Sequence, residues 1–369
     1  MIIEQHGNLL VADADALVNT VNTVGVMGKG IALQFKRAFP ANFKAYKRAC
    51  DAGKVTLGRM HVWDSGGMGA ERHRFVINFP TKQHWKSQSQ LADIESGLTD
   101  LLNVVDKMGI RSIAIPPLGC GLGGLKWSDV RPAIERAFAG RPHITVLLFS
   151  PDGAPAAANQ LNQTARPKMT AGRATLILAM SRYLPFTLDI APIEIHKLMY
   201  FLQMTGEPLE LDYAKARYGP FASKLRHLLN SVEGHFVQGV GDGSAKALES
   251  QPFTILPGAL DEAKAFLRNQ PETQQRLERV CELIEGYESV YGLELLATTH
   301  WAAFHNMDGS PRQSLADDET IIHVVRSWND RKSKIFTSAH VAAALHRLNA
   351  LGWLTTPGKP PGTLFATQV

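Results

Sequence analysis

The chain has 369 residues, of which 45% are hydrophobic and 20% charged, enough apolar material for about two or three globular domains. The net charge of +5 fits a protein that meets an anionic substrate, and no dense Lys/Arg run predicts a nucleic-acid-binding tail. No segment reads as a signal peptide or approaches the ~20 apolar residues of a membrane span. Three widely spaced cysteines form no C-x-x-C pair, so we expect a soluble, cytoplasmic protein without a membrane partner.

Residues 1–152 alternate short apolar runs with helical patterns. Strands are predicted at residues 9–11, 16–18, 60–63, 75–79, 112–116 and 144–149. Helices are predicted at residues 31–48, with a break at Pro40, at 89–107, with Ser89 as the N-cap, and at 127–138. The last strand, ITVLLF, shows no polar alternation, which indicates a sheet covered on both faces. This half is therefore predicted to be an α/β domain.

Two glycine-rich loops in this half each follow a strand and precede a helix. Loop one covers residues 22–30, and loop two covers residues 119–124. Neither loop matches the G-x-G-x-x-G or G-x-x-x-x-G-K-[ST] fingerprint, and either alone is as compatible with a plain turn as with an anion site. Because ligands of open α/β sheets bind at the carboxyl ends of strands, the two loops together predict one anionic ligand between them.

The segment NFPTKQHW places Lys82 just past a predicted buried strand. On the residues alone, a phosphate-contacting or solvated lysine is the simpler interpretation. A catalytic amine with a lowered pKa is the more specific interpretation. His84 is expected to be structural or on the surface. Trp85 is equally compatible with a place in the core and with stacking on a nucleobase.

Residues 153–170 are small, polar and proline-containing, which predicts a linker to a second domain at residues 171–369. The second domain is predicted to be mainly helical with a small β element, because GDG separates two β-like runs. Helices are predicted at residues 174–183, 194–204, 262–269, 272–287, 294–304, 319–328 and 338–351, with another that starts at Pro220.

Five histidines of the second domain do not have the spacing of metal ligands, and no cysteine or carboxylate cluster accompanies them in the sequence. They are expected to be structural or surface residues, and no metal is predicted. These residues are His196, His227, His235, His300 and His305.

The motifs GNLL, ALVNTVN, VGVMGKGIALQFK, NFPTKQHW and PPLGCGLGGLKW resemble those of macrodomains, and specifically those of DarG antitoxins, over nearly all of residues 1–150. The resemblance implies ADP-ribose as the ligand, with loop two around the pyrophosphate and loop one at the distal ribose. Asn22 would bond the ribose hydroxyls. Asn8 would replace the Asp that many macrodomains place against adenine, and its amide oxygen can accept the same bond. The implied contacts are Asn8, Leu9, Leu10, Asn22, Gly28, Lys29, Gly30, Ile31, Thr81, Leu118, Gly119, Cys120, Gly121, Leu122, Gly123 and Gly124.

The same resemblance implies that Lys82 is catalytic, because the matching lysine of DarG-like macrodomains is essential for hydrolysis. Related lysine-using macrodomains often add an Asp in loop two, at the position that Gly123 holds here. Without that Asp, three alternative roles stay open for Lys82. It would attack C1″ of the distal ribose after ring opening, or only stabilise the leaving group, or activate water.

The implied reaction removes ADP-ribose from thymidine of single-stranded DNA, without a cofactor and with ADP-ribose as product. The DNA would emerge beside Lys82, His84, Trp85 and Lys86. A non-catalytic ADP-ribose reader and a hydrolase acting on protein adducts are the alternatives.

KLMYFLQ and RYGPFASKLRHLL resemble the SocA-like, or Panacea, antitoxin domains over roughly residues 171–351. The resemblance implies that the second domain binds and neutralises a toxin, the ADP-ribosyltransferase DarT. A winged, basic helical domain that binds operator DNA is the alternative.

Overall fold

The computed structural model describes residues 1–66, 74–151, 155–187, 189–244 and 251–354. Its contacts divide the chain into two compact units. The first unit contains residues 1–165 together with residues 241–244, and the second contains the other described residues from Arg166 onward. The helices of the described residues are all too short or too polar to cross a bilayer.

The first unit is built on a six-stranded sheet with the strand order β1-β6-β5-β2-β4-β3. Neighbouring strands are parallel, except that β3 runs antiparallel to β4, so the sheet is mixed. In chain order the elements are β1 (Ile2–Gln5), η1 (Leu9–Val11), β2 (Ala16–Asn22), α1 (Gly30–Ala38), α2 (Pro40–Asp51), β3 (His61–Asp64), β4 (Phe75–Lys82), α3 (Leu91–Met108), β5 (Ser112–Ile115), α4 (Trp127–Phe138), β6 (Thr145–Phe149) and η2 (Ala157–Asn159).

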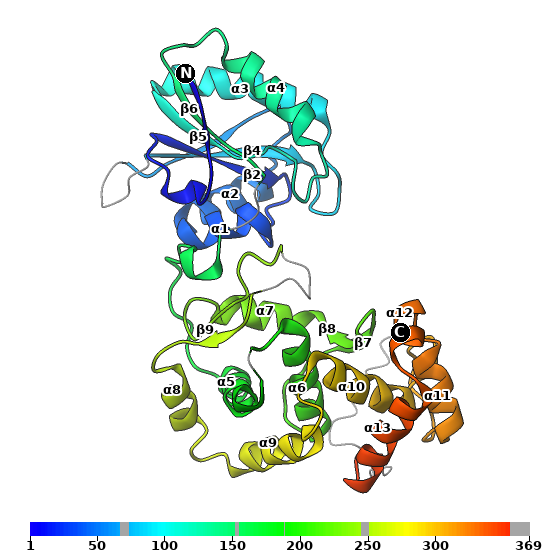
Figure 1. The fold of residues 1–369 in the computed structure, drawn as a ribbon. Helices are drawn as coiled ribbons and strands as arrows, with labels where there is room; N and C mark the ends of the chain where they lie inside the picture. The colour runs from blue at the N-terminus through cyan, green and yellow to red at the C-terminus, as the bar shows by residue number, and fades with distance from the viewer. Residues whose placement is uncertain (67–73, 152–154, 188, 245–250, 355–369) are drawn as a thin grey trace. The chain divides into compact units, whose positions relative to one another are not determined.

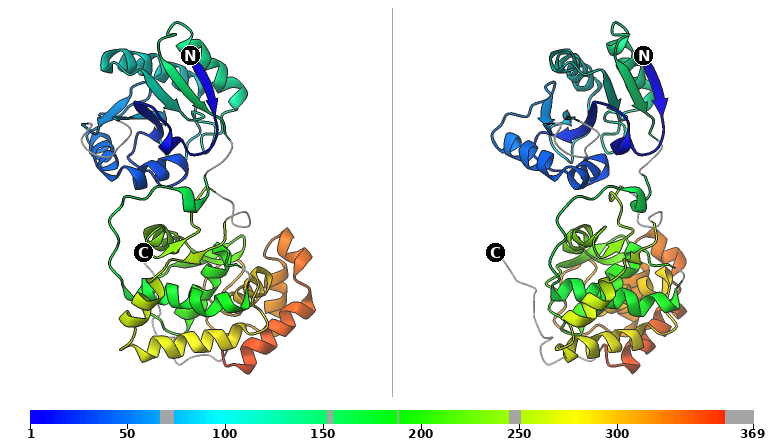
Figure 2. Two further views of the ribbon diagram at one scale, coloured as in Figure 1. Left: turned by 60° about the vertical axis from the view of Figure 1, so that its left-hand side comes forward. Right: turned by 90° about the vertical axis from the view of Figure 1, so that its left-hand side faces the viewer.

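Helices cover both faces of this sheet. Helices α3 and α4 lie on one face, and α1 and α2 lie on the other (Figures 1 and 2). The strands alternate accordingly: Val18 and Ile77 belong to the core under α3 and α4, whereas Leu17 and Val76 pack with Phe35 of α1. The uniformly apolar strands therefore reflect two buried faces, as the sequence predicts.

Two local predictions for this unit are wrong, and one strand was not predicted. Residues 9–11 form a 3₁₀ helix instead of a strand, because the Asn8 side chain accepts from the Leu10 N–H and caps a turn. Ser89 is not the N-cap of α3, since the helix begins at Leu91 after Gln90. Strand β1 (Ile2–Gln5), absent from the prediction, pairs with β6 at the sheet edge. The predicted glycine loop around Gly66 continues into residues outside the described ranges.

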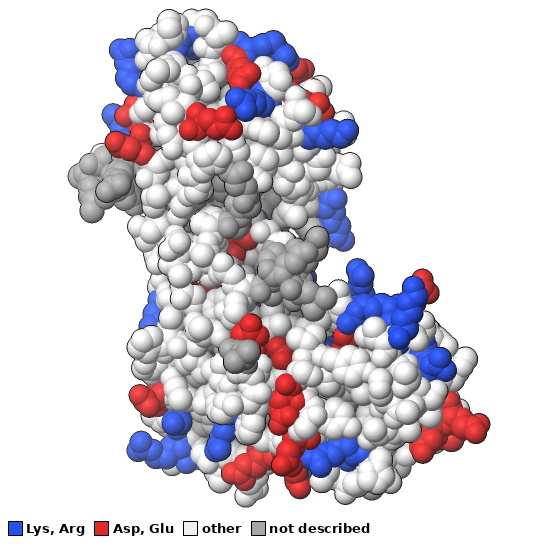
Figure 3. Space-filling view, in the orientation of Figure 1, with Lys and Arg blue, Asp and Glu red and all other residues white. Residues whose placement is uncertain are grey.

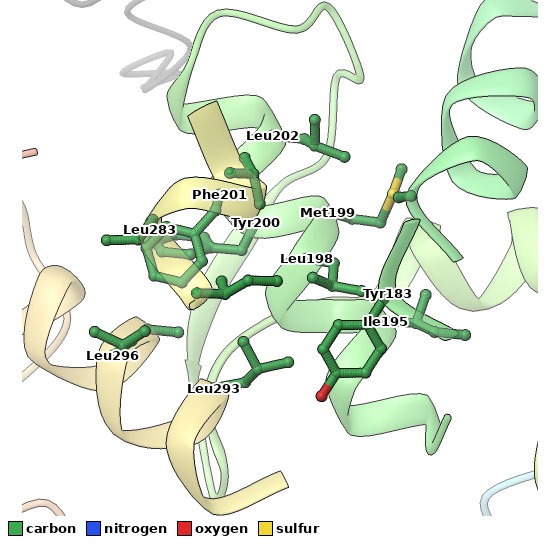
Figure 4. Close-up of a cluster of buried hydrophobic side chains, with 14 of the residues drawn as sticks. Tyr183, Ile195, Leu198, Met199, Tyr200, Phe201, Leu202, Leu283, Leu293 and Leu296 are labelled. Atoms are coloured by element: carbon green, nitrogen blue, oxygen red, sulfur yellow. The ribbon is translucent and has the colours of Figure 1, made fainter. Parts of the chain in front are cut away.

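The second unit is mostly helical, as predicted. Its elements are α5 (Ala171–Tyr183), η3 (Leu184–Phe186), α6 (Pro192–Met204), β7 (Tyr213–Ala216), β8 (Gly219–Ala222), α7 (Ser223–Val232), β9 (Val237–Gln238), β10 (Thr254–Ile255), α8 (Ala259–Phe266), α9 (Pro271–Ile284), α10 (Val290–Phe304), α11 (Asp318–Arg326), α12 (Asp330–Ile335) and α13 (Ser338–Ala350). Figure 4 shows side chains of α5, α6, α9 and α10 in one apolar cluster, which includes Leu198 of α6, Leu283 of α9 and Leu293 of α10.

Glu294 places a buried charge inside this core. Its carboxylate accepts from Arg331 Nη1 at 2.7 and 3.0 Å and from the buried Lys332 ammonium. Lys332 also donates to Thr298 Oγ1 at 2.9 Å. Burial lowers the pKa of Lys332 to about 8. Because Glu294 belongs to α10 and Arg331 and Lys332 belong to α12, this cluster holds the two helices together inside the second unit.

Two predictions for the second unit need correction. Pro220 lies in β8, paired with Lys215 of β7, and the helix begins three residues later at Ser223. The Pro220 carbonyl accepts from the buried Lys197 Nζ at 2.7 Å, an interaction that a local pattern cannot reveal. Helix α12 was not predicted. The β-like runs around GDG do pair, as the two-residue strands β9 and β10.

Three of the five histidines pack as structural residues, whereas His227 is exposed. His196 stacks on Phe221 with the ring centroids 4.3 Å apart, and His305 stacks on Trp301 at 3.6 Å. His300 Nδ1 lies 2.8 Å from the Tyr200 hydroxyl. Figure 3 shows both acidic and basic side chains on the visible face of each unit, so neither visible face carries charge of a single sign.

Candidate functional site

Three adjacent strands of the first unit end at one edge of the sheet. Loop one follows β2, loop two follows β5, and Lys82 is the last residue of β4. Strand β2 lies between the other two, and its last residue, Asn22, is the Cα partner of Lys82. The parallel sheet therefore brings the two glycine loops and the lysine together at the carboxyl ends of its strands, as predicted.

Loop two presents unpaired backbone N–H groups. The loop closes on itself through the Leu125 N–H, which donates to the Gly119 carbonyl at 3.0 Å, and it is held to the segment before α3 by the Ser89 N–H, which donates to the Gly123 carbonyl at 2.9 Å. Successive free N–H groups in a tight loop form a concave site for an anion. In loop two, the backbone amides that donate to no group among the described residues are those of Gly119, Gly121, Leu122 and Gly123.

Gly119 and Gly123 have no room for a side chain. A Cβ on Gly123 would lie 2.4 Å from both the Gly119 carbonyl oxygen and Ser89 Oγ, and Gly119 has φ of +72°. The Ser89 hydroxyl is buried and has no hydrogen-bond partner among the described residues. The close packing explains why Gly123 cannot be the Asp of related macrodomains in this loop conformation.

Replacing Gly123 with Ala is expected to weaken ADP-ribose binding, because the added methyl group must displace the Gly119 carbonyl and disturb the free N–H groups. Overpacking of this kind costs about 1–3 kcal/mol, which corresponds to about 5- to 150-fold in the dissociation constant if the loop bears the strain on binding. Gly140→Ala, outside the two loops, is the matched control, since its Cβ would meet no atom within 4 Å. Calorimetric titration with ADP-ribose measures both variants, and equal affinities would contradict the steric argument.

Loop one is shaped by the side chain of Asn22. Its Oδ1 accepts from the N–H groups of Val24 and Val26, and its Nδ2 donates to the Val26 carbonyl at 2.6 Å. The buried Tyr46 hydroxyl donates to the Asn22 carbonyl at 2.5 Å, and burial raises the pKa of Tyr46 well above its usual range. Asn22 therefore organises the loop in this structure, and its direct contact with ribose stays a prediction.

The start of α1 is occupied by residues from later in the chain. The Gly30 N–H donates to the Asp242 carbonyl at 2.9 Å, and Gln34 Nε2 donates to Asp242 Oδ2 at 2.7 Å. Arg37 Nη1 donates to the Gly241 carbonyl at 2.6 Å. The Gly30 amide is thus committed within the first unit, and a ligand at this edge depends more on loop two than on the first turn of α1.

Lys82 crosses from β4 to loop two. Its Nζ donates to the Leu122 carbonyl at 2.9 Å, and partial burial lowers the pKa of Lys82 below the usual value for lysine. No Asp or Glu of the described residues forms an ion pair with it. The amine is therefore near the free N–H groups, and no carboxylate in the described part of the chain holds it in the charged form.

The remaining predicted contacts are placed less directly. Asn8 Oδ1 caps η1 and its Nδ2 donates to the Asn159 carbonyl at 2.9 Å, so its amide is engaged, while the side chains of Leu9 and Leu10 are buried in the core. Thr81 is buried on β4, and burial raises the pKa of Cys120 to about 11, which keeps its thiol protonated. Ligand contacts by Asn8, Leu9, Leu10, Gly28, Lys29, Ile31, Thr81, Leu118 and Cys120 stay predictions.

A buried amide network under the site was missed. Asn19 Nδ2 of β2 donates to Asn78 Oδ1 of β4 at 2.9 Å, and Asn78 Nδ2 donates to Asn42 Oδ1 of α2 at 2.8 Å. His61 Nδ1 lies 3.3 Å from Asn78 Nδ2. The sequence signal was an asparagine in the middle of each of two buried strands, which costs free energy unless it is hydrogen bonded.

Comparisons with known proteins agree with the macrodomain resemblance. The Macro domain family model matches residues 18–134. A DNA ADP-ribosyl glycohydrolase of Mycobacterium tuberculosis is 41% identical over 360 residues, which cover 94% of this chain and 99% of the relative. The solved macrodomain of M. tuberculosis DarG is 51% identical and covers 41% of this chain and 99% of that one, with a TM-score of 0.40.

A further relative is a DNA ADP-ribosyl transferase-DNA ADP-ribosyl glycohydrolase fusion protein of Thermosipho africanus. It is 35% identical over 159 residues, which cover 40% of this chain and 41% of the fusion. The identity to the M. tuberculosis relative, in contrast, extends over nearly the whole length of both chains. The chain therefore belongs to the DarG family of DNA ADP-ribosyl glycohydrolases.

Proposed function

We propose that the first unit hydrolyses the bond between ADP-ribose and thymidine in single-stranded DNA, with Lys82 as the catalytic residue. The observation that carries the proposal is the position of the Lys82 amine, at the Leu122 carbonyl of loop two and across from Asn22 at the end of β2. The free N–H groups of loop two suit the pyrophosphate, and the ribose beyond it would reach the lysine. The 41% identical relative of M. tuberculosis is named a DNA ADP-ribosyl glycohydrolase, which supports the same reaction.

Hydrolysis of this bond requires a nucleophile at C1″ and a proton for the leaving base. The oxygen of water ends on C1″, the electron pair of the broken C1″–N bond leaves with the thymine nitrogen, and that nitrogen takes up a proton. A neutral Lys82 amine can accept the proton of the attacking water, or attack C1″ itself and be released by water later. Both routes need Lys82 without its proton.

The rate of release is therefore expected to rise with pH. Because burial lowers the pKa of Lys82, a larger fraction of the amine is neutral at a given pH than for an exposed lysine. The rate constant should increase tenfold per pH unit below this pKa and level off above it, with a midpoint below 10.5. Single-turnover release of ADP-ribose from a modified oligonucleotide, measured from pH 6 to 10, checks this. A rate that falls as pH rises would contradict a neutral amine.

We also propose that the second unit binds and inhibits the cognate DarT transferase. The fusion of transferase and glycohydrolase in one T. africanus chain shows that the two activities are paired there, and the resemblance of residues 171–351 to toxin-neutralising domains supports direct binding. The full chain with Lys82→Ala is then expected to inhibit the transferase at equimolar concentration without erasing its product. The measurement is transfer of ADP-ribose to an oligonucleotide. Undiminished transfer at saturating variant would contradict direct binding.

We propose a cytoplasmic location. The proposed substrate is cellular DNA, and the described cysteines Cys50, Cys120 and Cys281 are all free thiols, as expected in a reducing compartment.

A further inference from the structure

The segment that follows Lys82, residues 83–87, forms a hydrogen-bonded turn at the edge of the site. The Ser87 N–H donates to the His84 carbonyl at 2.9 Å, and the Lys86 N–H donates to His84 Nδ1 at 3.3 Å. The turn is tied to loop one, because the N–H and Oγ1 of Thr23 both donate to the Gln83 carbonyl, at 3.1 and 2.9 Å. Residues 83–87 therefore have a fixed place beside the end of β4.

This turn holds a tryptophan at the surface. The Trp85 side chain is 50% exposed, which rules out the alternative that it belongs to the core. The His84 ring lies with its centroid 5.1 Å from the Trp85 ring, and Lys86 Nζ lies 4.9 Å from the indole centroid. One exposed apolar residue is ordinary in a folded protein, so exposure alone does not identify a function.

Trp85 is, however, one of four exposed apolar residues on the segments next to Lys82, and Val26 of loop one, at 40%, is another. Leu122, whose carbonyl accepts from Lys82 Nζ, is 58% exposed, and Val24, next to the Thr23 anchor, is 43% exposed. These four residues leave apolar surface in contact with water on the three segments that surround the proposed catalytic amine, although others, such as Met1 and Met108, lie elsewhere on the first unit. Such exposure costs free energy that a partner surface would recover.

The same three segments carry positive charge without negative charge. Residues 19–38, 80–92 and 116–128 contain no Asp or Glu. They contain Lys29, Lys36, Arg37, Lys82, Lys86 and Lys126. A surface that combines exposed aromatic and apolar side chains with lysines is suited to a single-stranded nucleic acid, in which bases stack on aromatic rings and phosphates meet cations.

We propose that Trp85 is a stacking platform for a base that adjoins the modified thymidine, and that Lys86 contacts the neighbouring phosphate. This inference rests on the proposed function, since it describes how the same site holds the DNA that carries ADP-ribose. A base inside a duplex has both faces covered by its neighbours, so the platform selects single strands. Trp85 is a binding residue in this account and takes no part in the bond-breaking step.

The test compares an ADP-ribosylated thymidine nucleoside with a single-stranded oligonucleotide that carries the same modification. For the full chain, Trp85→Ala is expected to lower the ratio of kcat/KM for the oligonucleotide to kcat/KM for the nucleoside by about 10-fold, mostly through KM. Trp85→Phe should restore most of the ratio, because phenylalanine also stacks. Phe186→Ala, which removes an exposed aromatic ring from the second unit, should leave the ratio unchanged.

A second measurement separates this inference from the proposed function. In the Lys82→Ala background, adding Trp85→Ala should weaken binding of the modified oligonucleotide by about 10-fold more than binding of free ADP-ribose. Lys86→Ala should reduce the slope of log affinity against log salt by about 1. If the wild-type chain releases no ADP-ribose but Trp85→Ala still weakens oligonucleotide binding, the proposed function fails and the platform stands.

Two results would overturn the platform. One is an equal effect of Trp85→Ala on nucleoside and oligonucleotide, which would assign Trp85 to the ADP-ribose site or to loop stability. The other is an equal effect on a modified protein substrate, which would assign the exposed ring to a general apolar contact and not to a nucleobase.

Discussion

Lys82→Ala is expected to abolish measurable release of ADP-ribose from modified DNA while leaving ADP-ribose binding nearly intact. Loss of a positioned general base or nucleophile lowers the rate by about 10²–10⁴-fold or more. The affinity for ADP-ribose should change by less than about fivefold, because a partly exposed lysine contributes little free energy to binding. Single-turnover kinetics and calorimetric titration measure the two effects separately.

Lys107→Ala is the control for this experiment. Lys107 is an exposed lysine in the last turn of α3, so its removal takes away the same charge from the first unit without touching the site. It should change neither rate nor affinity. A Lys82→Ala variant that hydrolyses at more than about one tenth of the wild-type rate would show that the chemistry does not depend on the amine.

The covalent and the general-base routes differ in what borohydride can trap. If the Lys82 amine attacks the ring-opened ribose, reduction during turnover should leave ADP-ribose on Lys82, detected by peptide mass. Labelling at Lys86 or Lys107 under the same conditions measures adventitious reaction. No enrichment at Lys82 over those residues would favour activation of water.

Glu294→Ala is expected to destabilise the second unit by about 3–5 kcal/mol, because it leaves a buried cation without its partner. The Glu294 and Lys332 side chains are both fully buried, and Arg331 is the second cation on the carboxylate. The remaining donor contact of Lys332, to Thr298 Oγ1, cannot balance a charge. Urea unfolding followed by the helical circular dichroism signal measures the loss.

Two variants make this result interpretable. Glu294→Gln keeps the volume and one acceptor and should cost less than Glu294→Ala. Lys224→Ala breaks the exposed pair with Asp212 and should cost at most about 1 kcal/mol. If Glu294→Ala is no more destabilising than Lys224→Ala, the buried cluster does not hold α12 to α10 as described.

Local patterns predicted the parts of the site that follow from chain order. Each glycine loop comes directly after an apolar strand, and parallel strands end at a common edge, so the order of the chain alone groups loop one, loop two and Lys82. The turn signal at Pro40 likewise separated α1 from α2 correctly. These predictions depend on interactions within a few residues or on general rules of sheet topology.

Other features depend on partners far apart in sequence and had no local signal. Asp242 reaches Gln34 across 208 positions, and the Nδ2 group of Asn19 donates to Asn78, 59 positions away. The packing between Gly123 and Ser89 is equally invisible in the sequence, although it decides which residue loop two can carry. The exposure of Trp85 was undecided for the same reason, since an aromatic residue in a turn is compatible with either environment.

The central claim is that the chain removes ADP-ribose from DNA, and one measurement tests it most directly. Purified full-length protein is incubated with a single-stranded oligonucleotide that carries ADP-ribosylated thymidine, and both products are identified by mass. The account predicts free ADP-ribose and an unmodified oligonucleotide, at a rate far above that for an ADP-ribosylated protein. Binding of the modified oligonucleotide without any release, or faster release from the protein, would contradict it.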